Sequence, residues 1–297
     1  MAIIKDAKLD ALFTSANASF EKGKPTAPNH YEKIATVVTS DSDSETYHWL
    51  GKFPKLKEWI GERTLKNIAS HGYIIQNKTY ESSVNVSVDD LNDDKFGVYA
   101  PLFSEMGLEA TVYPNRYIFE LLKKGFENTC YDGQYFFDTD HPVGAGVFSN
   151  TEAPDTPTGD ETPWFVLDTR RALKPLIFQR RENPILKQLD YRLDSHNEMI
   201  YGIKARFSAG YGFPQMAFAS TKELTADNLK NAISKMKSFK DEEGNPLGIN
   251  PNVLVVAPNM EWIAKDLLEM QITTSMNGTK SNVLYKALEV FSSEWLA

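Results

Sequence analysis

The sequence is poor in cysteine and in long apolar runs. Cys130 is the one cysteine among 297 residues, which excludes an intrachain disulfide and any zinc module built from several cysteines. The longest clean apolar run, residues 253–257, is far shorter than the roughly 18 residues that a membrane-spanning helix needs. The first residues also lack the basic region and the apolar stretch of a signal peptide. We therefore expect a soluble chain that is made in a reducing compartment and has no membrane partner.

Positive charge is also in deficit. Lys and Arg total 32 against 40 Asp and Glu, which gives a formal net charge of −8. Such a chain is a poor candidate for a protein whose main task is to grip phosphate backbones. One local basic cluster exists, made of Arg170, Arg171, Lys174, Arg180 and Arg181. It has no interleaved aromatic residues for base stacking, so pairing with acidic surface explains it at least as well.

The first part of the chain shows little of the pattern of a compact core. Residues 1–50 are polar, with a short helix expected near 7–21, and they need another surface to become ordered. Residues 72–88 alternate between apolar and polar, which predicts a two-stranded ribbon with its tip at 76–79. Its apolar members are Tyr73, Ile75, Val84, Val86 and Val88. An isolated ribbon is marginal in water and requires a partner surface.

From residue 89 onward helical and strand patterns alternate irregularly, which indicates the α+β class. Apolar positions and capping residues predict one helix that starts at Asp89 or Asp90 and a second that Pro114 opens. The other expected elements are an exposed loop at 144–163, strands at 176–179 and 199–207, a helix capped by Thr225, a buried strand at 253–257, a helix opened by Pro258 that holds Trp262, Leu267 and Met270, and a last strand at 283–291.

One stretch, residues 130–142, invites an enzymatic interpretation. Asp138, Asp140 and His141 lie within four positions and could together hold Mg²⁺, Mn²⁺ or Zn²⁺. A catalytic zinc site needs three separated ligands and an open position, however, and the sequence contains no HExxH motif. The alternative is that the two aspartates accept backbone N–H groups in a tight turn that Pro142 fixes. We therefore expect no metal, no cofactor and no catalytic residue, and a metal-dependent enzyme is the less favoured alternative.

Several strings occur together in an order that is specific to one family. They are YHWLG at 47–51, PKLKEWIGER at 54–63, CYDGQYFFDTDHP at 130–142, KPLIFQ at 174–179 and VLVV at 253–256. In these strings the chain resembles the Mu-like prophage major head subunit, and the resemblance covers about residues 10–290. It implies a tailed-phage major capsid protein with the Hong Kong 97-type fold, which is assembled in the bacterial host cytoplasm and resides in the virion.

The resemblance also implies how the chain is divided. The expected parts are an N-terminal arm at 1–50, an extended loop at 51–88, a peripheral domain at 89–220 with a spine helix at 93–111, an axial domain at 221–282, and a return strand to the peripheral domain at 283–297. On this basis we expect the extended loop to contact neighbouring copies through Trp59, Ile60, Arg63, Tyr73, Ile75, Val84, Val86 and Val88.

The function that the resemblance implies is self-assembly rather than catalysis. Hexamers and pentamers of the chain would form a shell that encloses phage double-stranded DNA without sequence specificity, with scaffold, protease and portal proteins as further partners. One structural alternative stays open, because the same fold also forms encapsulin compartments, which enclose cargo enzymes instead of DNA. The loop assignment predicts that a subunit from which residues 74–86 are deleted still folds but no longer forms closed shells.

Overall fold

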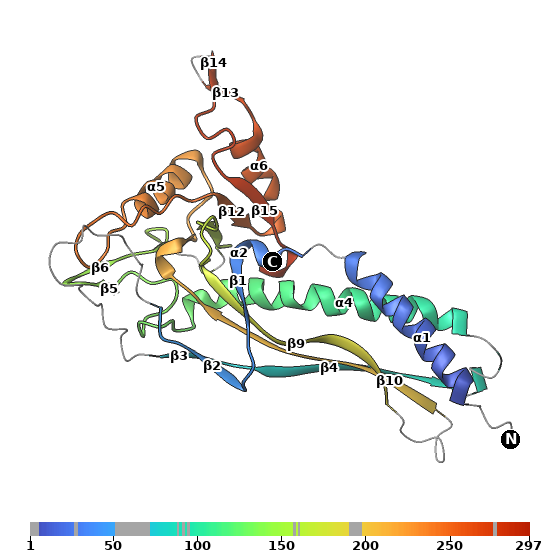
Figure 1. Cartoon of the computed structure of the whole chain (residues 1–297). Coiled ribbons are helices and arrows are strands. Elements are labelled where there is room, and N and C mark those ends of the chain that lie inside the picture. Colours follow the sequence, from blue (N-terminus) through green and yellow to red (C-terminus); the bar gives the residue numbers. More distant parts are fainter. Residues whose placement is uncertain are drawn as a thin grey trace.

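The computed structural model describes residues 6–26, 29–50, 72–87, 89, 90, 93, 96–156, 159, 161–189, 198–275 and 278–297. Figure 1 shows an elongated lower body, made of a long sheet and helix α4, with a smaller unit of sheet and helices above it and a hairpin at the top. None of the described helices is both long enough and apolar enough to cross a bilayer.

A four-stranded sheet forms the lower body. In order across the sheet, its strands are β1 (Ala35–Thr39), β9 (Leu176–Leu189), β10 (Glu198–Tyr211) and β4 (Lys78–Ser87). β9 and β10 form a long antiparallel pair, β4 is antiparallel to β10, and β1 is parallel to β9. The strands predicted at 176–179 and 199–207 are confirmed. β9 extends beyond its prediction because its second half mixes exposed and buried residues, which hides the apolar run.

Helix α4 (Phe96–Lys123) lies along this sheet, and α1 (Asp6–Gly23) crosses α4. Two helices were predicted over the range of α4, with Pro114 opening the second, but the structure has one helix with Pro101 and Pro114 inside it. The prediction was wrong because it relied on proline as a helix start. An interior proline removes one backbone hydrogen bond, and the packing of α4 on two hydrophobic clusters offsets that cost.

Helix α1 confirms the helix predicted near 7–21, but its order does not depend on a neighbouring copy. Its apolar residues Leu12, Ala16 and Phe20 are buried in a cluster with α4 and the sheet. The two helices approach so closely that a Cβ on Gly107 would lie 2.0 Å from the carbonyl oxygen of Phe20. The expectation that the arm becomes ordered only against other copies is therefore wrong for α1.

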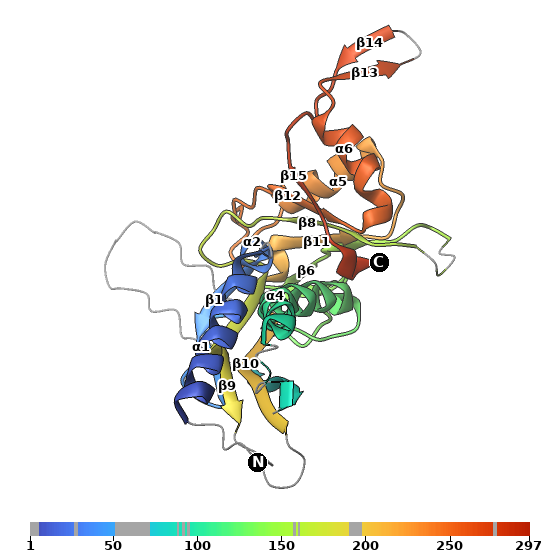
Figure 2. The same cartoon turned by 90° about the vertical axis from the view of Figure 1, so that its right-hand side faces the viewer.

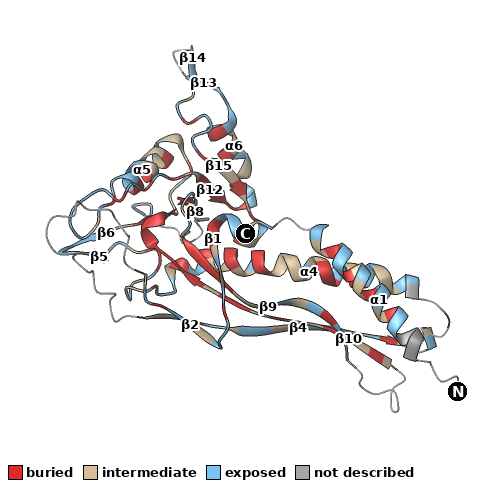
Figure 3. Ribbon diagram, in the orientation of Figure 1, coloured by how far each residue is buried: buried red, intermediate tan, exposed pale blue. Residues whose placement is uncertain are grey.

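A five-stranded sheet forms the centre of the upper unit. In order, its strands are β15 (Glu289–Ser292), β12 (Val253–Val256), β8 (Trp164–Leu167), β11 (Ala217–Ser220) and β7 (Thr151–Glu152). Every residue of β8, β11 and β12 is buried (Figure 3), because α4 covers one face of the sheet while α5 (Ala226–Lys237) and α6 (Glu261–Glu269) cover the other. Along β8, for example, Phe165 packs on the α4 side and Val166 on the side of α5 and α6.

The helix starts of the upper unit follow their sequence signals. Thr225 caps α5 as predicted, since its hydroxyl oxygen accepts from the backbone N–H of Asn228 at 3.3 Å. Pro258 opens the short 3-10 helix η4 (Pro258–Met260), which leads directly into α6. The remaining short helices are η1 (Lys24–Thr26), α2 (Tyr31–Ile34), η2 (Lys124–Phe126), η3 (Pro214–Met216) and η5 (Glu294–Leu296).

Three two-stranded pairs complete the described structure. They are β2 (Ser44–Tyr47) with β3 (Tyr73–Gln76), β5 (His141–Val143) with β6 (Gly146–Phe148), and β13 (Ile272–Ser275) with β14 (Gly278–Ser281). The predicted ribbon at 72–88 is therefore wrong: β3 and β4 follow one another across Asn77 without pairing, and their partners are β2 and β10. Period-two alternation predicts that a segment is a strand, but not which strand it pairs with.

Candidate assembly site

The residues predicted to contact neighbouring copies fall into two groups. Outside the described residues lie Trp59, Ile60, Arg63 and Val88. The described members, in β3 and β4, are Tyr73, Ile75, Val84 and Val86. These four pack within their own chain: Ile75 and Val86 are buried in hydrophobic clusters, and Tyr73 and Val84 are partly buried against the same clusters. Among the apolar side chains of β3, it is Ile74, 62% exposed, that faces solvent.

Hydrogen bonds tie the β2–β3 pair to the long sheet. The Tyr47 hydroxyl donates to Gln179 Oε1 at 2.8 Å, and Gln179 Nε2 donates to the carbonyl oxygen of Ile75 at 3.1 Å. The Tyr73 hydroxyl accepts from a backbone N–H of β10 at 3.1 Å. Burial raises the pKa of both tyrosines, so both hydroxyls stay protonated at neutral pH. The strands that flank segment 51–71 are thereby fixed to the sheet.

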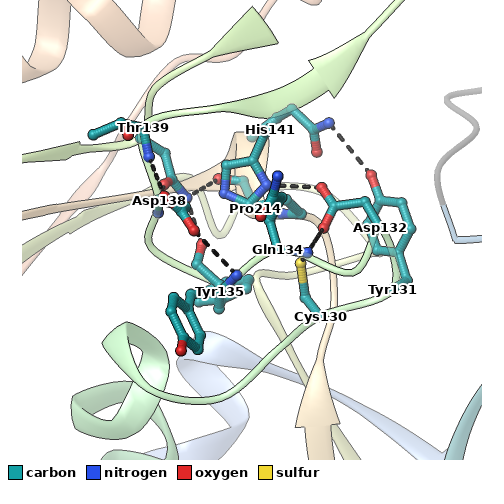
Figure 4. Close-up of polar contacts among 12 residues, drawn as sticks. Cys130, Tyr131, Asp132, Gln134, Tyr135, Asp138, Thr139, His141 and Pro214 are labelled. Atoms are coloured by element: carbon teal, nitrogen blue, oxygen red, sulfur yellow. Dashed lines mark hydrogen bonds and ion pairs between the residues drawn. The ribbon is translucent and has the colours of Figure 1, made fainter.

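A buried polar cluster lies in the loop after α4, but it differs from the trio that the sequence suggested. Asp132 is at its centre (Figure 4): one carboxylate oxygen accepts from the Cys130 thiol at 3.0 Å, and the other lies 2.7 Å from His141 Nδ1. The ligand atoms of these three residues lie within 4.8 Å of one another. Within the described residues this group has the spacing of a metal site, whereas Asp138 and Asp140 do not join it.

The electrostatics of this cluster are those of a hydrogen-bonded network. Burial, together with the charge of Asp132, raises the pKa of Cys130 far above its usual range, so the thiol stays protonated. Burial alone would raise the pKa of Asp132, but the hydrogen bonds from His141 and Cys130 outweigh that effect and lower it. A protonated thiol that donates to a buried carboxylate, which also pairs with a buried imidazole, forms a structural hydrogen-bond network.

Asp138 has the role that the turn alternative predicts. Its carboxylate accepts from the backbone N–H of Thr139 at 2.7 Å and of Tyr135 at 3.3 Å (Figure 4). Asp140 is exposed. Sequence analysis missed Asp132, because an aspartate followed by Gly133, which has a positive φ of 89°, reads as an ordinary turn.

The upper unit presents adjacent apolar side chains to solvent. Trp262 and Ile263 in α6 are 72% and 49% exposed, and Met270, which follows the helix, is 51% exposed. Trp262 and Met270 lie away from the core, because the buried residues Ala264 and Leu268 define the inner side of the helix. A scattered exposed apolar residue is ordinary, but a group of them marks an interaction surface.

The family model of the Mu-like prophage major head subunit gpT matches residues 9–296. The chain belongs to this family. It is 44% identical to the major capsid protein of Escherichia phage Mu over 304 residues, which cover 99% of this chain and 100% of that protein. A chain of the solved procapsid of bacteriophage JBD30 is 41% identical, with a TM-score of 0.86 and coverage of 98% of this chain and 100% of that one.

A capsid of bacteriophage JBD30 decorated with minor capsid protein trimers is similar as well, with 33% identity, a TM-score of 0.77 and full coverage of both chains. Membership of the head subunit family makes the chain a major capsid protein and a component of the virion. The mixed fold is that of these phage capsids and agrees with the expected Hong Kong 97-type fold. The family match also decides for a head subunit over an encapsulin compartment or a metal-dependent enzyme.

Proposed function

We propose that many copies of this chain assemble into a closed icosahedral shell that encloses phage double-stranded DNA. The observation that carries the proposal is the similarity, over 98% of this chain and at a TM-score of 0.86, to a subunit of a solved procapsid. Similarity at that level includes the backbone of the lower body as well as that of the upper unit.

The domain division implied by the resemblance is proposed with two changes. The lower body, with α4 as its spine, corresponds to the peripheral domain, and the unit with α5 and α6 to the axial domain. A boundary at residues 220 and 221 would divide the five-stranded sheet, because β7, β8 and β11 precede it while β12 and β15 follow it. We therefore place the junction between the two sheets. With this junction β15 belongs to the upper unit, parallel to β12, and is not a strand that returns to the peripheral domain. The last residues alone reach α4, where Lys123 Nζ donates to the carbonyl oxygen of Ala297 at 2.7 Å.

Segment 51–71 is proposed as the part of the extended loop that reaches a neighbouring copy, through Trp59, Ile60 and Arg63. The hydrogen bonds of Tyr47 and Gln179 support this assignment, since they hold the two strands that flank the segment on the subunit's own sheet. β4, in contrast, is a full strand of the subunit's own sheet.

The charge of the chain supports weak contact with packaged DNA. At a formal net charge of −8, the subunit is not suited to hold phosphate backbones tightly, so the DNA could be packed and later released. Portal, scaffold and protease proteins are proposed as further partners. By analogy with the decorated JBD30 capsid, minor capsid protein trimers are proposed as a partner of the outer surface.

Imaging of the purified full-length chain tests the proposal. Negative-stain electron microscopy and light scattering, on the chain alone and co-expressed with the scaffold and portal proteins of its genome, should show closed particles. Particles recovered from the bacterial host should contain nuclease-resistant double-stranded DNA. A chain that stays monomeric under all these conditions would refute the proposal, and particles filled with an enzyme instead of DNA would establish the compartment alternative.

A further inference from the structure

Helices α5 and α6 carry charges of opposite sign. α5 contains three lysines and one aspartate, whereas α6 contains three acidic residues and one lysine. That lysine, Lys265, is already paired with Glu261 at 2.5 Å. Among the described residues, the exposed side chains of Asp266 and Glu269 in α6 form no ion pair, and neither does exposed Lys237 at the end of α5. One helix therefore presents unpaired negative charge and the other unpaired positive charge.

The two helices lie near opposite edges of one face of the upper sheet. α6 packs on β12 and β15 at one edge, and α5 packs on β11 near the other edge. Figure 1 shows them on opposite sides of the upper unit, which Figure 2 views from the side of α6. A contact between the outer side of α6 in one copy and that of α5 in the next copy is therefore head-to-tail, and head-to-tail contacts can close into rings.

The outer side of α6 also carries an apolar anchor. Trp262 is 72% exposed and lies one turn before Asp266, while Met270 lies one turn after it. Lys265 Nζ lies 4.9 Å from the centre of the Trp262 ring, and this cation–π contact holds the indole in place. A positioned tryptophan among charged neighbours has the composition of a hot spot in a protein interface.

We propose that α6 of one copy docks on α5 of the next copy, an inference that rests on the shell of the proposed function. Trp262 is the apolar anchor, and Asp266 and Glu269 face Lys237 of the neighbour. Exposed ion pairs contribute little one at a time, but a ring repeats the contact at every subunit. The charge pattern also disfavours the α6–α6 and α5–α5 alternatives, which would bring like charges together.

Charge exchange tests this contact directly. At the concentration where half of the wild-type chain is in particles, Asp266→Lys and Lys237→Glu should each reduce the assembled fraction about tenfold, and the double variant should restore roughly half of the wild-type value. The matched control combines Asp266→Lys with Lys187→Glu, an exposed lysine of β9. This control has the same net charge as the double variant but should remain defective.

Trp262→Ala is the second variant, and it should reduce assembly with an unchanged melting temperature, because the side chain is exposed in the subunit. If the wild-type chain forms no particles, the proposed function fails and the inference fails with it. If the wild-type chain and Asp266→Lys assemble equally, the α6–α5 contact alone is wrong. Equal rescue by Lys187→Glu would overturn it as well, since net charge would then explain the effect. Variants that assemble normally but lose a minor capsid protein would assign α6 to that partner instead.

Discussion

Gly107→Ala should destabilise the subunit, although alanine is the better helix former. In a helix interior this exchange alone favours folding by about 1 kcal/mol. Here, however, a Cβ on residue 107 would lie 2.0 Å from the carbonyl oxygen of Phe20, whereas real Cβ atoms essentially never come closer than 3.0 Å. Helices α1 and α4 would have to move apart by about 1 Å at their crossing.

The cost of that movement exceeds the gain in helix propensity. Both partners in the clash are backbone, so no side-chain rotation relieves it, and Gly23 sets the same close distance, because a Cβ there would lie 1.9 Å from the carbonyl oxygen of Ser104. A gap of up to about 1 Å forfeits a quarter to a half of the dispersion energy across it. Overpacking typically costs about 1–3 kcal/mol. Taking the upper end for a backbone clash and subtracting the propensity gain leaves a net loss of about 2 kcal/mol.

Urea unfolding, at chain concentrations below those that produce particles, measures this loss. Gly97→Ala in the same helix is the matched control, because a Cβ there would have nothing within 4 Å. It should be neutral or stabilise the chain by up to about 1 kcal/mol. Backbone amides of α1 should also exchange faster in the Gly107→Ala variant. If the two variants proved equally stable, the packing of α1 on its own α4 would be wrong, and the arm would have to dock on another copy.

Further changes test other parts of the subunit. Asp132→Ala leaves the Cys130 thiol and the His141 ring buried without their acceptor and should lower the free energy of unfolding in urea by about 1–3 kcal/mol for each unsatisfied group. Asp132→Asn should cost less, and a chelator should leave the wild type unchanged. Because the pKa of Asp132 is held below its usual value, its stabilisation is present at neutral pH and is lost as the pH falls toward the pKa of the folded state. A pH series should show this loss in the wild type but not in Asp132→Ala. Because β4 pairs with β10 along its whole length, the prediction that a subunit without residues 74–86 still folds is withdrawn. Deletion of residues 78–87 should abolish soluble expression, and a soluble monomer with a native circular dichroism spectrum would contradict the sheet order. Thr225→Ala should cost about 1 kcal/mol through the lost cap of α5, which thermal unfolding measures.

Local signals predicted local structure well. The helix capped by Thr225 and the helix near 7–21 could be predicted because caps and apolar periodicity act within a few residues. Strand pairing could not, since β3 and β4 alternate as a ribbon would, while their partners at 44–47 and 198–211 are distant in sequence. Pro114 does not start a helix for a related reason: the packing that keeps α4 continuous across it is tertiary.

The candidate assembly residues show a second limit of prediction from sequence, which concerns what covers an apolar side chain. Ile75 and Val86 were correctly identified as apolar positions of strands, but a subunit core and an interface between subunits use the same apolar side chains. Sequence alternation therefore cannot distinguish burial in the same chain from burial by a neighbour. Asp132 shows the opposite case, in which a side chain that the sequence suggests is exposed is in fact buried. Its neighbouring residues are those of an ordinary surface turn, although its carboxylate accepts hydrogen bonds from buried side chains.

The burial of Ile75 and Val86 also changes which surfaces can supply the energy of assembly. Apolar area that folding has already removed from water gains nothing further on association. Association must then draw on side chains that the folded subunit leaves exposed, and α6 concentrates Trp262 and Ile263 there beside the unpaired Asp266. Acidic residues next to an apolar patch oppose its contact with another copy of the same patch and favour a basic one. Charge can thus set which helix of one subunit faces which helix of the next, while repetition of the contact around the ring supplies stability. Charge exchange tests that pairing directly, whereas removal of the apolar residues tests only whether they are buried on assembly.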